Sequence, residues 1–144
     1  MIEIAVSEHD HRPIRPDGPH SPEGTRAIAA GIDSAFRLLN YATMNPAGLT
    51  YPSDVYSVLG ELSAAVSKLP QALHQMSQFI NTKVADGAVR ENPDYGKHGG
   101  NADAAYAELA AAVRNSSATA TELGRLLDKA QSAISGLEAA DDDR

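Results

Sequence analysis

The sequence predicts an all-α protein built around a long antiparallel helical hairpin. Residues 53–86 and 102–138 carry apolar side chains at alternating steps of four and three, the spacing of a helix with one apolar face. The chain has five Tyr, two Phe and no Trp among its 144 residues. So few bulky side chains favour a thin bundle over a thick globular core, and the length fits one domain.

A shorter helix is predicted to begin near Ser21. Serine is a good N-cap, Pro22 suits the first helical position, and Glu23 places a negative charge where the helix dipole favours it. The helix should end before the breaker cluster at 45–48. Its apolar positions are Ile28, Ile32, Ala35, Leu39 and Ala42.

The first half of the hairpin has a proline in its middle. Pro70 removes one helical hydrogen bond and its ring presses on the carbonyl of Val66, yet the apolar spacing continues in phase beyond it. The sequence therefore predicts one kinked helix over 53–86, about 50 Å long, opening at Thr50 or Ser53 and capped by Gly87. The predicted seam is Val55, Leu59, Leu62, Val66, Leu69, Leu73, Met76 and Ile80, with a second line at Val58, Ala65, Ala72 and Phe79.

The second half follows a turn-rich loop over 88–100 and begins after Asn101, a predicted N-cap. Facing residue numbers in the two halves should add up to about 188 if the turn centres near 94. Pro70 would then face the small residues at 116–120. The predicted seam is Ala102, Tyr106, Leu109, Val113, Ser116, Ala120, Leu123, Leu127, Ala130, Ile134 and Leu137.

The short helix is expected to cover only the start of the first hairpin helix and the end of the second, which makes a three-helix bundle at one end. At the two-helix end, apolar residues lack cover, and either another chain or the loop and N-terminal arm must supply it. The candidate partner-interface residues are Met76, Phe79, Tyr106 and Val113.

Three segments organise the chain. Residues 1–20 are predicted to be an extended arm, strand-like at Ile2, Ile4 and Val6, and then proline-rich. Prolines at 13, 16, 19 and 22 follow the period of polyproline II. Residues 21–138 form the helical bundle, and residues 139–144 form an acidic, solvated tail.

Composition argues against several functions. A net charge of −7 with twelve Lys and Arg predicts that neither nucleic acid nor an anionic membrane is a partner. The chain has no Cys, and no run of apolar residues reaches signal or membrane-spanning length, so we expect a cytoplasmic protein.

No catalytic, cofactor or metal site is predicted. His9, His11 and His20 lie on a proline-rich arm that offers no scaffold for metal geometry. The run 96–100 before Asn101 suggests an anion site at a helix N-terminus, but it lacks P-loop spacing, which favours an ordinary turn.

The stretch YPSDVYSVLGELSAAVSKLPQAL, within residues 41–137, resembles small all-helical proteins encoded on actinobacterial plasmids and integrative or phage-like elements. This resemblance implies no catalytic residues.

The sequence thus predicts a non-enzymatic interaction or assembly protein that acts through its hairpin on another protein or on itself. The alternative is an acidic regulator that sequesters a toxin, repressor or DNA-binding protein. A small enzyme or ligand carrier would need a concave pocket with converging polar groups.

Overall fold

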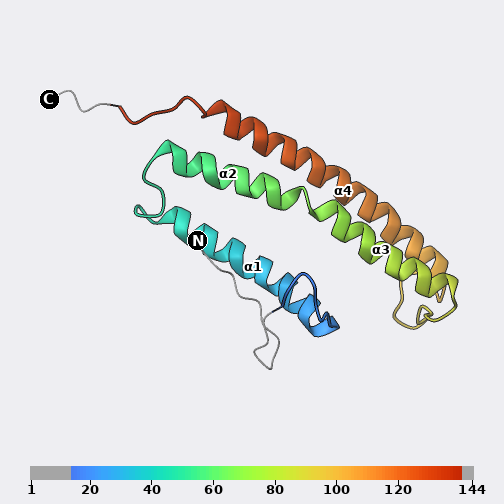
Figure 1. Ribbon diagram of the computed structural model, residues 1–144. Helices are drawn as coiled ribbons and strands as arrows, with labels where there is room; N and C mark the ends of the chain where they lie inside the picture. Colours follow the sequence, from blue (N-terminus) through green and yellow to red (C-terminus); the bar gives the residue numbers. More distant parts are fainter. Residues whose placement is uncertain (1–13, 141–144) are drawn as a thin grey trace. The chain divides into compact units, whose positions relative to one another are not determined.

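The computed structural model describes residues 14–140, and within that range the chain contains helices, turns and loops but no strand (Figure 1). The helices are α1 (Pro22–Met44), α2 (Pro52–Val66), α3 (Leu69–Ala85) and α4 (Ala102–Ala133). The chain divides after Thr50 into two compact units, one with α1 and one with α2, α3 and α4. The predicted all-α fold, with a kinked hairpin and a shorter helix, is confirmed; the cover of the hairpin by α1 stays a prediction.

The ends of α1 agree with the sequence. The Ser21 hydroxyl oxygen accepts the Gly24 N–H at 2.9 Å, and Pro22 opens the helix. The segment before α1 differs from the prediction, because Gly18, with φ of 88°, donates its N–H to the Arg15 carbonyl at 3.1 Å. The chain therefore turns at 15–18 instead of running extended, while the strand-like start of the arm lies outside the described residues.

The predicted kink at Pro70 is present, but the helix is interrupted there instead of continuous (Figure 1). Ser67 and Lys68 keep right-handed backbone angles, while the Lys68 N–H bonds the Ala65 carbonyl at 3.2 Å, which tightens the chain. The freed Ala64 carbonyl accepts the Lys68 ammonium at 2.7 Å and the Ser67 hydroxyl at 2.8 Å. Local side chains thus satisfy the carbonyl that loses its usual N–H donor where the chain tightens.

The other hairpin ends are built by caps. The Asp54 carboxylate accepts the Tyr51 N–H at 2.8 Å at the start of α2, and the Asn101 side chain accepts the Ala104 N–H at 3.0 Å at the start of α4. Gly87 ends α3 with φ of 66°, while the Ala88 N–H reaches the Lys83 carbonyl at 2.9 Å. This is the glycine cap that the sequence predicted.

The last helix is shorter than predicted. It ends at Ala133, and residues 134–136 form a turn, so the expected continuation to 138 is wrong. The Ser135 hydroxyl bonds the Ser132 carbonyl at 2.9 Å, which competes with the helical pattern. Gly136 follows, a residue that is costly inside a helix.

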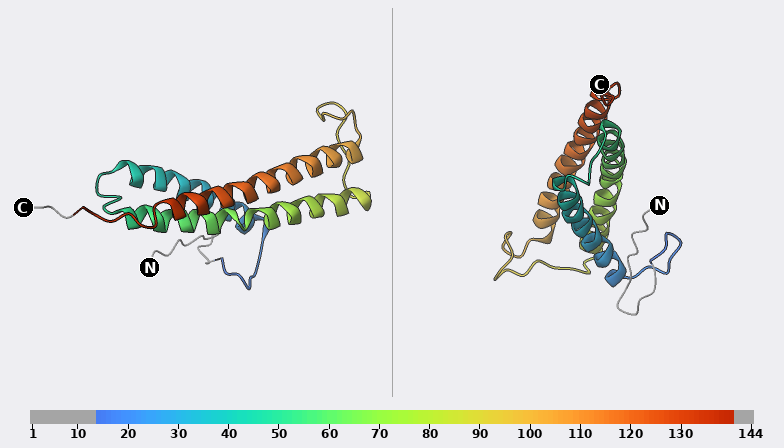
Figure 2. Two further views of the ribbon diagram at one scale, coloured as in Figure 1. Left: turned by 90° about the horizontal axis from the view of Figure 1, so that it is seen from above. Right: turned by 90° about the vertical axis from the view of Figure 1, so that its left-hand side faces the viewer.

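α2 and α3 pack in sequence along α4, in an antiparallel hairpin (Figure 2). The Ser63 hydroxyl bonds the Gly124 carbonyl at 3.3 Å, and the Gln131 amide bonds the Tyr56 carbonyl at 3.0 Å. In both pairs the residue numbers add up to 187, which confirms the predicted alignment of the two halves.

About half of the predicted seam lies inward as expected, including Val66, Leu73 and Ala120, but the alternate positions are displaced by one residue on both sides of the hairpin. Four small residues on the hairpin are buried, and they are Ser63, Ser77, Ala120 and Gly124. Leu69, Met76 and Leu123, predicted to face inward, are 45%, 55% and 45% exposed. Small inward side chains let the two backbones approach closely, and the larger neighbours are left on the flank. As a result, no large side chain is fully buried in residues 14–140.

Candidate interaction surface

The hairpin has two different sides. On α2 and α3 the inward residues include Ser63 and Ser77, and the residues directly before them are Leu62 and Met76. On α4 the residue before the inward Gly124 is Leu123. In an antiparallel pair, the positions that precede these inward residues lie on the same side of both helices.

Large apolar side chains gather on this side. Leu69, Met76, Phe79, Leu123 and Leu126 are between 45% and 60% exposed, and Leu62 and Leu109 are half-buried. Exposed apolar patches of this kind mark sites of interaction when they are contiguous. We call this face the apolar side of the hairpin; it consists of Val58, Leu62, Leu69, Met76, Phe79, Leu109, Leu123 and Leu126.

The opposite side is polar and closed by hydrogen bonds. The Ser63 hydroxyl donates to the Asp128 carboxylate at 2.5 Å. The Gln131 side chain packs closely against Gly60, where an added Cβ would lie 2.4 Å from the Gln131 amide nitrogen. The outward positions on this side of α3 and α4 include Gln71, His74, Gln78, Thr121 and Arg125. The two sides therefore differ in chemistry as well as in shape.

An apolar depression opens at the loop end of the apolar side, with a volume of about 300 Å³. Leu109, which lies on the apolar side together with Met76 and Phe79, forms part of its wall. Arg90 and Glu91 of the loop border it. The apolar lining is Ile80, Val84, Val89, Ala102, Ala105, Tyr106 and Leu109.

The four candidate interface residues fall in three places. Met76 and Phe79 are exposed on the apolar side of α3, and the Lys83 ammonium lies 5.6 Å from the centre of the Phe79 ring. Tyr106 lines the depression. Val113 is half-buried and lies on the inward line of α4. The structure thus exposes two of the four on the apolar side, whereas Tyr106 and Val113, seven residues apart on α4, are both half-buried on its inward line.

The loop that borders the depression is fixed by one carboxylate. Glu91 accepts the backbone N–H of His98 at 2.9 Å and that of Gly100 at 2.8 Å. It also pairs with the His98 Nδ1 at 2.8 Å, while the His98 Nε2 lies 2.6 Å from the Glu108 carboxylate on α4. The chain's own Glu91 therefore occupies the backbone N–H groups that suggested an anion site.

The charges of this cluster support one another. Burial raises the pKa of Glu91, but the hydrogen bonds from His98 and Gly100 outweigh it and hold the pKa below its ordinary 4.5. The hydrogen bond to Glu91 is the main reason that the pKa of His98 lies above its ordinary 6.5, and Glu108 adds to this against the effect of burial. The protonated imidazole is thus favoured between the two carboxylates.

Sequence reasoning missed this cluster. Glu91 and His98 are seven residues apart across a turn, and Glu108 is ten residues further on in a helix. No periodic spacing connects the three, and only the fold of the loop brings them together.

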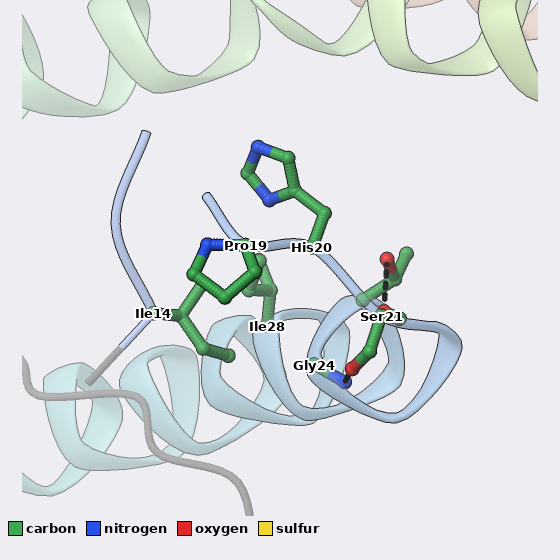
Figure 3. Close-up of a pocket in the computed structure, with 7 residues that line it drawn as sticks. Ile14, Pro19, His20, Ser21, Gly24 and Ile28 are labelled. Carbon is green, nitrogen blue, oxygen red and sulfur yellow. Dashed lines mark hydrogen bonds between the residues drawn. The ribbon is translucent and has the colours of Figure 1, made fainter. Parts of the chain in front are cut away.

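The start of α1 carries a much smaller hollow, about 10 Å³ in volume and lined by Ile14, Pro19 and Ile28 among others (Figure 3). This is space for about one water molecule. The His20 imidazole projects away from α1 and bonds the Pro16 carbonyl at 3.2 Å. We assign no ligand site here.

No group of three or more His, Asp or Glu side chains within residues 14–140 is arranged to hold a metal ion. None of the helices in this part of the chain is both long enough and apolar enough to cross a membrane.

Comparison with known proteins gives no match: no family model, no curated protein and no solved structure matches the chain. The resemblance to helical proteins of actinobacterial mobile elements stays a prediction.

Proposed function

We propose that this chain is a non-enzymatic interaction or assembly protein, and that its hairpin binds another protein or a second copy of itself. The observation that carries the proposal is the gathering of exposed apolar side chains on one side of the hairpin, next to an open apolar depression. A partner helix with apolar residues on one face would suit such a surface, because helices dock into apolar grooves through side chains spaced three, four and seven apart.

The proposal includes a cytoplasmic location, no cofactor, and no nucleic-acid or membrane partner. The low content of Lys and Arg and the net charge of −7 support the last two points. Membership among helical proteins of mobile elements is part of the same proposal and rests on the sequence resemblance alone.

The test is a pair of matched substitutions on α3. Phe79→Glu places a charge on the apolar side, whereas Gln78→Glu places the same charge on the polar side one residue earlier. We expect light scattering to show a wild-type assembly, or a complex with a partner isolated from the native host. Phe79→Glu should dissociate it, while Gln78→Glu should not.

Circular dichroism provides the check on folding, since both positions are exposed and helical content should change little in either variant. A wild-type chain that remains monomeric at high concentration and binds no protein would overturn the proposal. So would equal effects of the two substitutions.

The second candidate is an acidic regulator that sequesters a toxin, a repressor or a DNA-binding protein. The excess of Asp and Glu favours it, with nineteen acidic against twelve basic residues. Salt separates the two candidates, because charge mimicry weakens when the Debye length falls well below ~10 Å. Apolar packing should survive about 0.5 M salt, where that length is only a few ångströms.

A further inference from the structure

The loop over residues 86–101 forms one wall of the apolar depression through Val89, Arg90 and Glu91. His98 of this loop has two ring nitrogens that both face carboxylates: Glu91 at 2.8 Å and Glu108 at 2.6 Å. One carboxylate belongs to the loop and the other to α4. His98 is therefore the link between the loop and the second helix of the hairpin.

Hydrogen-bond chemistry determines which form of the ring fits this place. A neutral imidazole carries one N–H, so it donates to only one of two carboxylates and turns a lone pair toward the other. The imidazolium carries two N–H groups and satisfies both. The described geometry is thus that of a protonated ring.

The charged groups that act on His98 come from two elements. Glu91 is part of its own loop, and Glu108 belongs to α4. Two other charged residues lie nearby in the sequence: Lys97, the neighbour of His98, and Asp103 in the first turn of α4. Within residues 14–140, neither of them makes a hydrogen bond or ion pair with His98, and no charged group of α3 does. Both partners are carboxylates, so losing the proton removes one of the two N–H bonds and takes the positive charge from the other.

We propose that the Glu91–His98–Glu108 chain is a proton-dependent latch that holds the loop against α4 and fixes one wall of the apolar depression. The latch is a property of the single chain. Only its consequence for partner binding rests on the proposed function, since a released loop changes the shape of the surface that the partner contacts.

The direction of the pH effect follows from the two residues. His98, with a raised pKa, contributes fully below its ordinary value of 6.5, and the contribution is lost as pH rises through the higher folded value. Glu91, with a lowered pKa, contributes above its ordinary value of 4.5, and the contribution is lost as pH falls through the lower folded value. The latch is therefore complete between pH 4.5 and 6.5 and opens above the pKa of His98.

The experiment is an NMR titration of the His98 ring, with amide exchange measured over the same pH range in the dilute, monomeric chain. We expect the His98 and Gly100 amides, both bonded to Glu91, to lose protection by about tenfold as the ring deprotonates, the size expected for a charge-assisted hydrogen bond. The Gly24 amide, which bonds the Ser21 hydroxyl at the start of α1, is the internal reference and should show no such step.

Three variants make the outcome decisive. Glu108→Gln should move the step to lower pH, whereas Glu122→Gln, on the same helix but paired with Arg125, should leave it in place. His98→Gln should remove the step and leave the Gly100 amide weakly protected throughout. Protection that is independent of the ionisation of His98, or a His98 titration unchanged in Glu108→Gln, would overturn the latch. Either result is independent of whether the chain binds a partner.

Discussion

The hairpin is held together differently along its length: one half is where α2 packs on α4, and the other half is where α3 packs on α4. Where α2 meets α4, the Ser63 hydroxyl bonds the Asp128 carboxylate at 2.5 Å, and the Gln131 amide bonds the Tyr56 carbonyl at 3.0 Å. Where α3 meets α4, no side-chain hydrogen bond joins the two helices within residues 14–140. That half contains the depression of about 300 Å³ instead.

The difference shows that hydrogen bonds between the helices and open apolar surface are placed in separate parts of this thin hairpin. Hydrogen bonds from side chains to the facing helix close the α2 half. The α3 half has no such bond within residues 14–140, and its loop end opens into the depression. We expect substitutions to have unequal effects in the two halves.

The largest difference should come from one substitution made at two alanines of α4. Ala120 is 5% exposed, so Ala120→Leu forces extra atoms into a closed interface and should lower the free energy of unfolding by ~1–3 kcal/mol. Ala105 lines the depression, so Ala105→Leu has space to occupy and should be neutral or stabilising. Helix propensity changes little between Ala and Leu, and it changes equally at both sites.

Urea unfolding of the two variants measures this difference directly. Equal losses at both sites would mean that the depression is not open in solution, and the contrast between the halves would then be wrong.

A second comparison uses truncation instead of enlargement. Leu127 is half-buried on the inward line of α4, and Leu127→Ala should cost ~2 kcal/mol, at the low end for buried leucines. Met76, on the apolar side of α3, is 55% exposed, and Met76→Ala should change the stability of the monomer by less than ~1 kcal/mol. Thermal unfolding at a concentration where the chain is monomeric tests both; similar losses would show that Met76 is covered within the chain.

Much of the fold was predictable because it depends on neighbouring residues. Ser21 and Asn101 cap helices by bonding N–H groups three residues on, and Gly87 ends α3 with a positive φ. Such contacts are encoded in a few consecutive residues. The alignment of α4 against α2 and α3 was also predictable, because a single turn determines which residues face each other.

Half of the inward positions, such as Val66 and Leu127, agree with the predicted seam, but the alternate positions were not predictable in the same way. Leu62 and Ser63 each belong to a line of residues at steps of seven, and apolar spacing alone favours the leucine. The choice of the serine depends on how closely the α2 and α4 backbones approach at Gly124, which is a contact between residues far apart in the chain. The same choice separates the candidate interface residues: Met76 and Phe79 lack cover within the chain, as expected of residues that a partner would cover, whereas Val113 is half-buried on the inward line.

The smallest effect should come from two buried serines, which occupy equivalent inward positions fourteen residues apart on α2 and α3. Ser63 is 8% exposed and donates to Asp128, so Ser63→Ala removes a hydrogen bond between helices and should cost ~1 kcal/mol. Ser77 is 7% exposed, and its side chain makes no hydrogen bond within the described residues. Ser77→Ala therefore should be neutral, or slightly stabilising, because alanine has the higher helix propensity.

A double variant tests which contact of Ser63 matters. If the hydroxyl acts through the Asp128 carboxylate, Ser63→Ala combined with Asp128→Ala should lower the free energy of unfolding little more than Asp128→Ala alone. Additive losses would assign the effect of Ser63 to its 3.3 Å contact with the Gly124 carbonyl instead. If Ser77→Ala and Ser63→Ala lower the stability equally, the hydrogen bond from Ser63 is not the reason for the difference between the α2 and α3 halves.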